Sequence, residues 1–151
     1  MPVDEQEAGW LCGAHGANLS TMSDNPTLAG TLIERMGITI DRVGPDGAEG
    51  TMPVDGNTQP YGLLHGGASA VLAETLASLA AMAHAGPGRV AVGVELSASH
   101  HRSVRSGTVR GVARAVHLGR SLATYDVVVD DGAGRRICTA RLTCMLIDER
   151  T

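Results

Sequence analysis

The stretch GLLHGGASAVLAETLAS, residues 62–78, decides the expected fold because it begins a long apolar helix. Nearly every residue in it is small or apolar, and eight alanines lie between Ala68 and Ala85, a composition that strongly favours a helix. We expect this helix from about Gly66 to His84, because the sequence GPG at 86–88 ends it. A helix that is apolar nearly all round must be buried on most of its sides.

The rest of the chain has the two-residue period of β-strands. Strand-like segments follow the helix at about 90–97, 107–116, 121–130 and 135–147, and two shorter ones precede it at 38–43 and 48–54. The first strand after the helix should carry Gly93, Glu95 and Ser97 on one face. Its other face should carry the apolar residues Val90, Val92, Val94 and Leu96. Sequential strands with tight turns form an antiparallel sheet, so we expect the α+β class.

These lengths predict a curved antiparallel sheet of about six strands that wraps the long central helix. The helix of about 19 residues spans roughly 28 Å, and strands of about ten to thirteen residues span roughly 33–43 Å. One sheet leaves part of the helix open, so we also expect a second subunit. A short helix should begin at Asn25 and Pro26 and end at Gly37. We interpret residues 1–25 as an N-terminal arm and 26–151 as a single domain.

The composition excludes several classes of function. The 151 residues carry a formal net charge of −4 and contain 2% aromatic residues, so neither a nucleic-acid partner nor an anionic membrane is expected. All basic residues are arginine, which excludes Schiff-base chemistry on a lysine. The three cysteines, Cys12, Cys138 and Cys144, have no framework spacing, and the acidic N-terminus has no basic signal-peptide region. We therefore expect a cytoplasmic protein.

Glu74 is the only fully charged residue between Gly66 and Ala85. Its neighbours three and four positions away on the helix include no basic residue, so no local ion pair is available. Burial of an unpaired carboxylate is costly and shifts its pKa, which makes Glu74 a candidate nucleophile or general base. Alternatively, Glu74 faces solvent, pairs with an arginine or caps a neighbouring group. Ser78, one turn further on, either binds this carboxylate or an attacking water, or bonds back to a helix carbonyl.

His65, Gly66 and Gly67 lie at the expected helix N-terminus. Free backbone N–H groups at such a terminus favour negative charge, and glycine lets a ligand approach closely, so a carbonyl oxygen could be polarised there as in an oxyanion hole. Alternatively, the two glycines only form a tight turn. Gln59, in the preceding loop, could orient a substrate or be solvated. With Glu74, these groups provide the chemistry for attack on a carbonyl.

A basic region follows the helix. The window between Glu95 and Asp126 contains no acidic residue but includes Arg102, Arg105, Arg110, Arg114, Arg120, His100, His101 and His117. This window is either the solvent face of two strands or a site for phosphates, which arginine binds well. His100 and His101 should point to opposite faces of a strand, and no other spacing predicts a metal site.

The segment QPYGLLHGGASAVLAE, residues 59–74, resembles the active-site segment of hotdog-fold acyl-CoA thioesterases. The type is that of the 4-hydroxybenzoyl-CoA thioesterase of Arthrobacter and the PaaI-like thioesterases of phenylacetate metabolism. Within the family, the segment is most similar to the 1,4-dihydroxy-2-naphthoyl-CoA thioesterases of menaquinone synthesis and their enterobactin-proofreading relatives. The similarity extends through 92–111, 117–119 and 134–143.

The resemblance implies a hotdog fold, dimers paired into tetramers, no cofactor or metal, and hydrolysis of a CoA thioester at a site shared by two subunits. It implies that Glu74 is the nucleophile or general base and that Gly66 supplies the oxyanion N–H. His65 and Gln59 would orient the thioester or the water, and Ser78 would help to position the water. The implied CoA-binding residues are Gly93, His100, Arg102, Ser103, His117, Gly119, Arg120 and Ser121.

We therefore expect an acyl-CoA thioesterase, with an aromatic acyl group as its preferred substrate. Three alternatives stay open at this point. The first is a hotdog module that binds acyl-CoA without hydrolysing it. The second is a hotdog dehydratase, whose usual histidine–acid motif is not found in the sequence. The third is a thioesterase that acts on acyl groups attached to an acyl-carrier protein.

Overall fold

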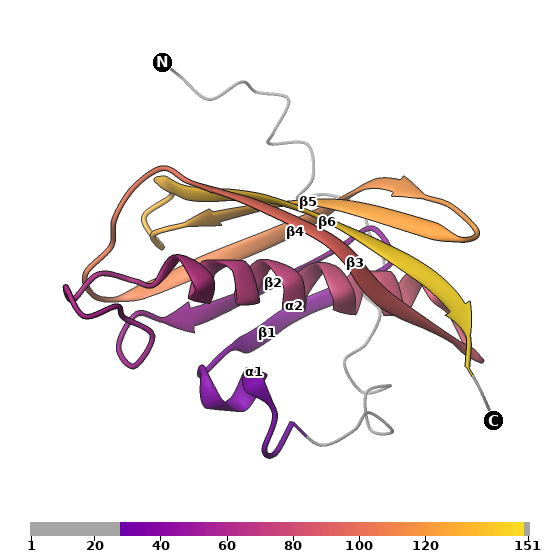
Figure 1. Cartoon of the computed structure of the whole chain (residues 1–151), viewed down its shortest axis with the longest axis horizontal. Coiled ribbons are helices and arrows are strands. Elements are labelled where there is room, and N and C mark those ends of the chain that lie inside the picture. The colour runs from indigo at the N-terminus through magenta and orange to yellow at the C-terminus, as the bar shows by residue number, and fades with distance from the viewer. Residues whose placement is uncertain (1–27, 150–151) are drawn as a thin grey trace.

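A computed structural model describes residues 28–149 and confirms the α+β class: a six-stranded antiparallel sheet packs on a long central helix (Figure 1). The elements in chain order are α1 (Leu32–Arg35), β1 (Thr39–Gly44), β2 (Gly47–Pro53), α2 (Gly66–Ala85), β3 (Arg89–His100), β4 (Thr108–Leu118), β5 (Leu122–Asp130) and β6 (Arg136–Asp148). The expected ranges of α2 and the last three strands agree with these bounds to within two residues. The chain has the hotdog fold.

The strand order β1-β2-β4-β5-β6-β3 makes β3 an edge strand. Tight hairpins join β4 to β5 and β5 to β6, but β3 crosses over to pair with the last strand of the chain. Helix α2 lies between β2 and β3 in the sequence and crosses the concave face of the sheet (Figure 1). The second edge is β1, so the sheet is open at both ends.

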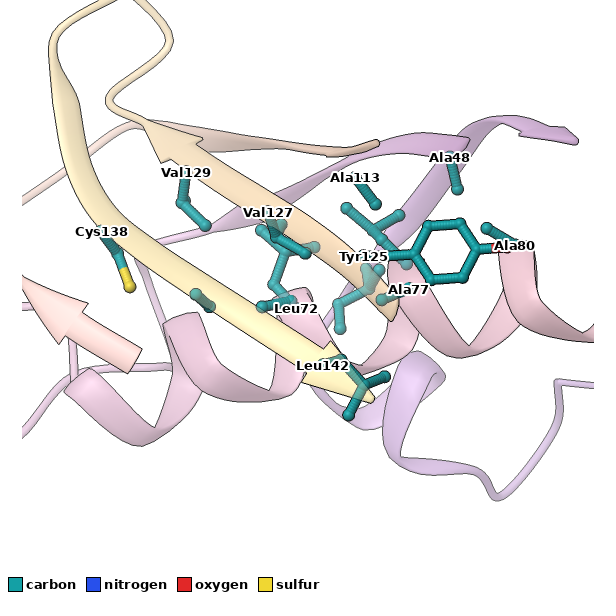
Figure 2. Packing of buried hydrophobic residues seen from close by; sticks show 14 of the residues in the cluster. Ala48, Leu72, Ala77, Ala80, Ala113, Tyr125, Val127, Val129, Cys138 and Leu142 are labelled. Atoms are coloured by element: carbon teal, nitrogen blue, oxygen red, sulfur yellow. The ribbon is translucent and has the colours of Figure 1, made fainter. Parts of the chain in front are cut away.

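The helix lies close to the sheet because glycines on β2 and β4 make room for its leucines. A Cβ at Gly111 would lie 2.6 Å from Leu76 Cδ1, and one at Gly50 would lie 3.0 Å from Leu76 Cδ2. Leu72 and Leu76 are fully buried, as are the alanines beside them on the same face of α2 (Figure 2). Tyr125, the largest buried side chain, donates its hydroxyl hydrogen bond to the Pro45 carbonyl at 2.7 Å.

Strand β3 differs from the expectation, because a bulge between Gly93 and Glu95 changes which residues face the helix. Val92 pairs with Met145 on the outer face of the sheet, whereas Leu96 pairs with the buried Leu142 on the inner face. The prediction that the valines and Leu96 share one face is therefore wrong. The side chains of β3 are also unusually exposed: Val92, Val94 and Leu96 are 45%, 52% and 37% exposed.

Two other expectations concern the ends of the elements. Within the described residues, the first helix is only the four-residue α1, and Thr31 caps it by accepting a hydrogen bond from the Glu34 N–H. The predicted start at Asn25 and Pro26 lies outside the described residues, as does the proposed boundary after residue 25. Helix α2 is long and apolar enough to cross a membrane, but eight of its twenty residues are buried in this fold, so it is a core helix.

Candidate active site

The N-terminus of α2 presents one unused backbone donor. His65 caps the helix: its Nδ1 accepts a hydrogen bond from the Gly67 N–H at 2.8 Å, and its carbonyl accepts one from Ala68. Since Nδ1 is an acceptor, the neutral His65 ring carries its proton on Nε2. Within residues 28–149, the Gly66 N–H has no hydrogen-bond partner. The Gly66 N–H is therefore available to a ligand, as expected for an oxyanion hole.

A cleft of about 380 Å³ opens beside this donor. The loop before α2, the first turn of the helix, the end of β3 and the start of β6 form its walls. The lining residues are Gln59, Leu63, Leu64, Gly66, Ser69, His100, His101, Arg102, Ser103 and Ile137. The His100 ring packs directly against Gly66, because a Cβ at position 66 would lie 2.9 Å from His100 Nε2. A larger residue at position 66 would therefore displace the imidazole.

The loop that carries Gln59 is held in place by backbone contacts at both of its ends. The Gln59 N–H donates to the Leu63 carbonyl at 2.8 Å, and the His65 N–H donates to the Asn57 carbonyl at 2.9 Å. The Asn57 amide in turn donates to the carbonyls of Met36 and Pro53, both at 2.8 Å. These contacts fix the loop on β2, so Gln59 lines the cleft from an ordered support.

Glu74 lies at a second location, near the middle of α2. Its carboxylate lies against Gly93 of β3, so closely that a Cβ at position 93 would overlap Glu74 Oε1. The Ser78 hydroxyl donates to the same oxygen at 3.4 Å, which confirms the predicted contact between these two residues. Burial raises the pKa of Glu74 above its ordinary value, and the Ser78 hydrogen bond lowers it by a smaller amount. A bound proton therefore leaves Glu74 at a higher pH than it leaves an exposed glutamate.

Gly66 and Glu74 do not meet within one chain. They are eight residues apart on one straight helix, which separates them by about 12 Å along its axis. The positions of β3 that face them, His100 and Gly93, are seven residues apart, or roughly 23 Å of strand. A carbonyl group bound at the Gly66 N–H is therefore out of reach of the same chain's Glu74.

The residues predicted to bind CoA also occupy separate regions. His100, Arg102 and Ser103 line the cleft at the N-terminus of α2, whereas Gly93 faces Glu74. The remaining four lie in or beside the β4–β5 turn: His117, Gly119, Arg120 and Ser121. This turn is close to the other end of α2, where His84 Nε2 is 2.9 Å from the Gly119 carbonyl oxygen.

The basic window is divided between the cleft and the outer face of the sheet. Arg102 lines the cleft and donates to the Arg136 carbonyl at 3.3 Å, and Arg105 donates to the Tyr61 carbonyl at 3.4 Å. Arg110 instead forms an ion pair with Glu49 on the outer face, as the alternative interpretation of this window predicted. Part of the window is thus available for a phosphate, and part is a solvated strand face.

Several residues of the site were not identified from the sequence. Ser69 is 2% exposed and lines the cleft, and Cys144 is fully buried opposite Gly93 on β6. His100, which the sequence did identify, packs its ring against Gly66 on the helix side, whereas His101 Nε2 lies 2.9 Å from Thr139 Oγ1 of β6; both residues line the cleft. Only the strand pairing brings Cys144 beside Gly93, so no local sequence signal could have identified it. Ser69 lies three residues after Gly66 on α2, and this helical spacing is the signal that could have identified it. Among residues 28–149 no three His, Cys, Asp or Glu side chains are grouped as metal ligands.

Comparison with known proteins identifies the class of protein to which this fold and site belong. Residues 61–138 match the Thioesterase superfamily, and the chain belongs to this family. It is a thioester hydrolase, so neither a non-catalytic binding module nor a dehydratase describes it. The proofreading thioesterase EntH of Cronobacter sakazakii is 52% identical over 124 residues, which cover 82% of this chain and 90% of the relative.

Solved structures of thioesterases have the same fold. Thioesterase HI1161 from Haemophilus influenzae has a TM-score of 0.80 and 35% identity, and the match covers 89% of this chain and 93% of the other. A mutant of thioesterase PA1618 from Pseudomonas aeruginosa has a TM-score of 0.81 and 35% identity, with 89% and 97% covered.

Proposed function

We propose that this thioesterase hydrolyses aromatic acyl-CoA thioesters at sites that two copies of the chain build together. The observation that carries the proposal is the separation of the free Gly66 N–H from the Glu74 carboxylate by about 12 Å along one helix. Both groups lie beneath β3, the exposed edge strand. A second copy that joins at this edge supplies the half of the site that each chain lacks.

Antiparallel pairing of β3 with its copy would bring the two halves together. Gly66 packs on His100 and Glu74 packs on Gly93, so the midpoint of these strand positions lies between Leu96 and Ser97. A two-fold axis at this midpoint sets His100 opposite the partner's Gly93, one strand spacing of about 4.8 Å away. The partner's Glu74 then lies beside the cleft of the first chain.

The same pairing would also assemble the separated CoA-binding residues. The partner's α2 runs in the opposite direction, and its last turn extends about 15 Å beyond its Glu74, since His84 is ten residues further along the helix. The β4–β5 turn of the partner, held by His84, is thereby carried towards the end of the molecule where Arg102 and Ser103 line the cleft. One CoA molecule could then contact both chains.

The proposed reaction follows from these positions. The thioester oxygen accepts a hydrogen bond from the Gly66 N–H, which stabilises the negative charge that develops on it. As a general base, the partner's Glu74 takes a proton from a water whose oxygen attacks the carbonyl carbon. The C–S bond then breaks, and the leaving thiolate takes the proton from Glu74. As a nucleophile, Glu74 would instead attack the carbonyl carbon itself, and the C–S bond would break with departure of the thiolate, leaving an acyl–glutamyl anhydride. Water would then hydrolyse this anhydride, releasing the acid and the free Glu74 carboxylate and giving its proton to the thiolate.

The walls of the cleft and Arg102 support the proposed acyl group and carrier. The apolar walls of the cleft, Leu63, Leu64 and Ile137, suit an aromatic ring such as hydroxybenzoyl or 1,4-dihydroxy-2-naphthoyl, and the second of these would connect the enzyme to menaquinone synthesis. Arg102 suits either phosphate-bearing carrier, so an acyl-carrier protein is the alternative to CoA. A cytoplasmic location agrees with the two buried free cysteines, Cys138 and Cys144.

We also propose that two such dimers associate into a tetramer. The outer face of the sheet carries an apolar row formed by Val92 of β3, Met145 of β6 and Leu122 of β5, which are direct neighbours in the strand register. Each is 42–45% exposed in the single chain. Sedimentation of wild type and of Met145→Asp tests this arrangement: the variant should sediment as a dimer, and a tetramer of the variant would refute this contact.

Release of free thiol from a panel of thioesters tests the proposed function. The panel contains aromatic, short aliphatic and long aliphatic acyl groups on CoA, and one aromatic acyl group on a carrier protein. We expect the highest kcat/KM for an aromatic CoA ester and a loss of several orders of magnitude in Glu74→Gln. Faster turnover of the carrier-protein ester would favour the alternative carrier. Unchanged turnover in Glu74→Gln would refute the role of this carboxylate.

A further inference from the structure

One side chain ties the turn between β4 and β5 to the last turn of α2. His84 lies in that last turn, and its Nε2 is 2.9 Å from the Gly119 carbonyl oxygen. A carbonyl oxygen can only accept a hydrogen bond, so His84 Nε2 carries a proton and is the donor. The two residues are 35 positions apart in the sequence, so this bond fixes the turn against the helix rather than stabilising either element by itself.

The bond from His84 takes the place of the one that often closes a β-turn. In a turn of four residues, the carbonyl of the first commonly accepts from the N–H of the fourth. Here the Gly119 N–H donates to the Leu122 carbonyl at 2.9 Å, but the Leu122 N–H makes no reciprocal bond to the Gly119 carbonyl. Among residues 28–149, His84 is the one group that binds this carbonyl. The orientation of the peptide between Gly119 and Arg120 therefore depends on His84.

That orientation decides what the turn presents to a ligand. The peptide is trans, so its C=O and N–H groups point in opposite directions. Because the Gly119 carbonyl points at His84, the Arg120 N–H points away from it, and this N–H has no partner within residues 28–149. A free N–H next to an exposed arginine suits a phosphate oxygen. A flipped peptide would present the carbonyl oxygen instead and would repel the phosphate.

Gly119 also holds a second basic group of the turn. The His117 ring packs against it so closely that a Cβ at position 119 would lie 2.5 Å from His117 Nε2. Gly119 thus contacts His84 through its carbonyl, Leu122 through its N–H and His117 through its Cα. A rotation of this residue would displace the basic groups on both sides of it.

We infer that His84 is a positioning residue for substrate binding: it holds the Gly119–Arg120 peptide in the orientation in which the turn binds a phosphate of the thioester's carrier. His84 touches neither the thioester nor the reacting atoms and acts through Gly119. The inference rests on the proposed function, in which the β4–β5 turn completes the CoA site. A histidine near the end of a helix can also stabilise the helix dipole alone, but that effect would change stability and not the affinity for CoA.

The test measures thiol release by wild type, His84→Leu and His84→Gln from two esters of one aromatic acid. The first ester is on CoA, and the second is on N-acetylcysteamine, which has the same thioester but no phosphate. His84→Leu should raise KM for the CoA ester about three- to tenfold, the size of one net hydrogen bond, while kcat stays within about twofold. His84→Gln keeps an N–H donor and should restore KM. For the N-acetylcysteamine ester, kcat/KM should be equal in all three proteins.

Calorimetric titration with free CoA gives the same comparison without turnover. The dissociation constant of CoA should rise in His84→Leu by the same factor as KM and should return to the wild-type value in His84→Gln. Thermal unfolding checks that the variants are folded. His84→Ala is a second variant without a donor and should behave as His84→Leu does.

Equal affinities for CoA in wild type and both donorless variants would overturn the inference. An equal loss on the two esters would also overturn it, because the N-acetylcysteamine ester has no phosphate for the turn to bind. Failure of His84→Gln to restore KM would show that the donor is not what matters. Inactive wild type or fully active Glu74→Gln refutes the proposed function, whereas turnover that depends on Glu74, with unchanged CoA affinity in His84→Leu, refutes only the role of His84.

Discussion

Replacement of Gly66 by proline removes the single backbone donor on which the proposed oxyanion site depends. Gly66 is the first residue of α2, a position where proline is well tolerated because no helix bond uses its N–H. The preceding His65 has φ −69° and ψ 130°, which is the extended conformation that a following proline requires. Gly66→Pro therefore deletes the donor with little disturbance of the helix.

Gly66→Ala is the matched control, because it adds a Cβ in the same place but keeps the N–H. In both variants this atom meets the His100 ring, which must move, since the unrelaxed distance to Nε2 is 2.9 Å. The two variants share this steric effect, so their ratio isolates the donor. Loss of one oxyanion-hole donor typically lowers kcat by about 10²- to 10³-fold.

The assay is steady-state thiol release from one aromatic acyl-CoA, with thermal unfolding as a check that all three proteins are folded. We expect kcat of Gly66→Pro to be about 10²- to 10³-fold below that of Gly66→Ala. Equal kcat values in the two variants, with both proteins folded, would refute the assignment of the Gly66 N–H to the oxyanion.

The remaining predictions concern the carboxylate and the core. Burial raises the pKa of Glu74, so kcat/KM should fall as the pH drops through this pKa, which lies above that of an exposed glutamate. Ser78→Ala removes a hydrogen bond that lowers the Glu74 pKa, so it should move the acid limb of the pH–rate profile to still higher pH. A carboxyl group whose pKa is raised on folding contributes stability that is present below its unfolded pKa and is lost as the pH rises through its folded pKa. Glu74→Gln should therefore increase the melting temperature at pH 7 but not at pH 4, and an equal change at both values would contradict the linkage. Leu76→Ala should lower the free energy of unfolding by about 2–5 kcal/mol in urea denaturation, because the side chain is fully buried over Gly50 and Gly111; a loss below about 1 kcal/mol would mean that the helix settles onto the sheet.

The helix and the strands could be predicted because their signals are local. The alanine-rich segment and the glycine and proline at 86–88 predicted α2 almost to its ends, and the alternating segments predicted the strands. The faces of β3 could not be predicted, because a bulge between Gly93 and Glu95 shifts the alternation and leaves no mark in the sequence. The alternation of apolar and polar residues in β3 fits a half-buried strand and an edge strand equally well, so the position of β3 at the edge of the sheet could not be predicted either.

The sequence predicted which chemical groups belong to the candidate site, but it did not predict how these groups are arranged in space. A charged residue in an apolar helix identified Glu74, and the glycines at the helix start identified Gly66. Helix geometry alone separates these two residues by about 12 Å. That the exposed edge of β3 covers both groups, and that Cys144 lies beside Glu74, depends on long-range pairing between β3 and β6. No pattern within a short window contains this information.

A mixture of two inactive variants tests the shared site most directly. Glu74→Gln and Gly66→Pro are expressed separately and together, and thiol release is measured for each preparation. Random pairing gives mixed dimers for about half of the molecules, and each mixed dimer has one intact site of two. A site shared by two chains therefore predicts about a quarter of the wild-type activity from the co-expressed pair, far above either variant alone. Activity no higher than that of the separate variants, with mixed dimers demonstrated by two different tags, would contradict a site built from two chains.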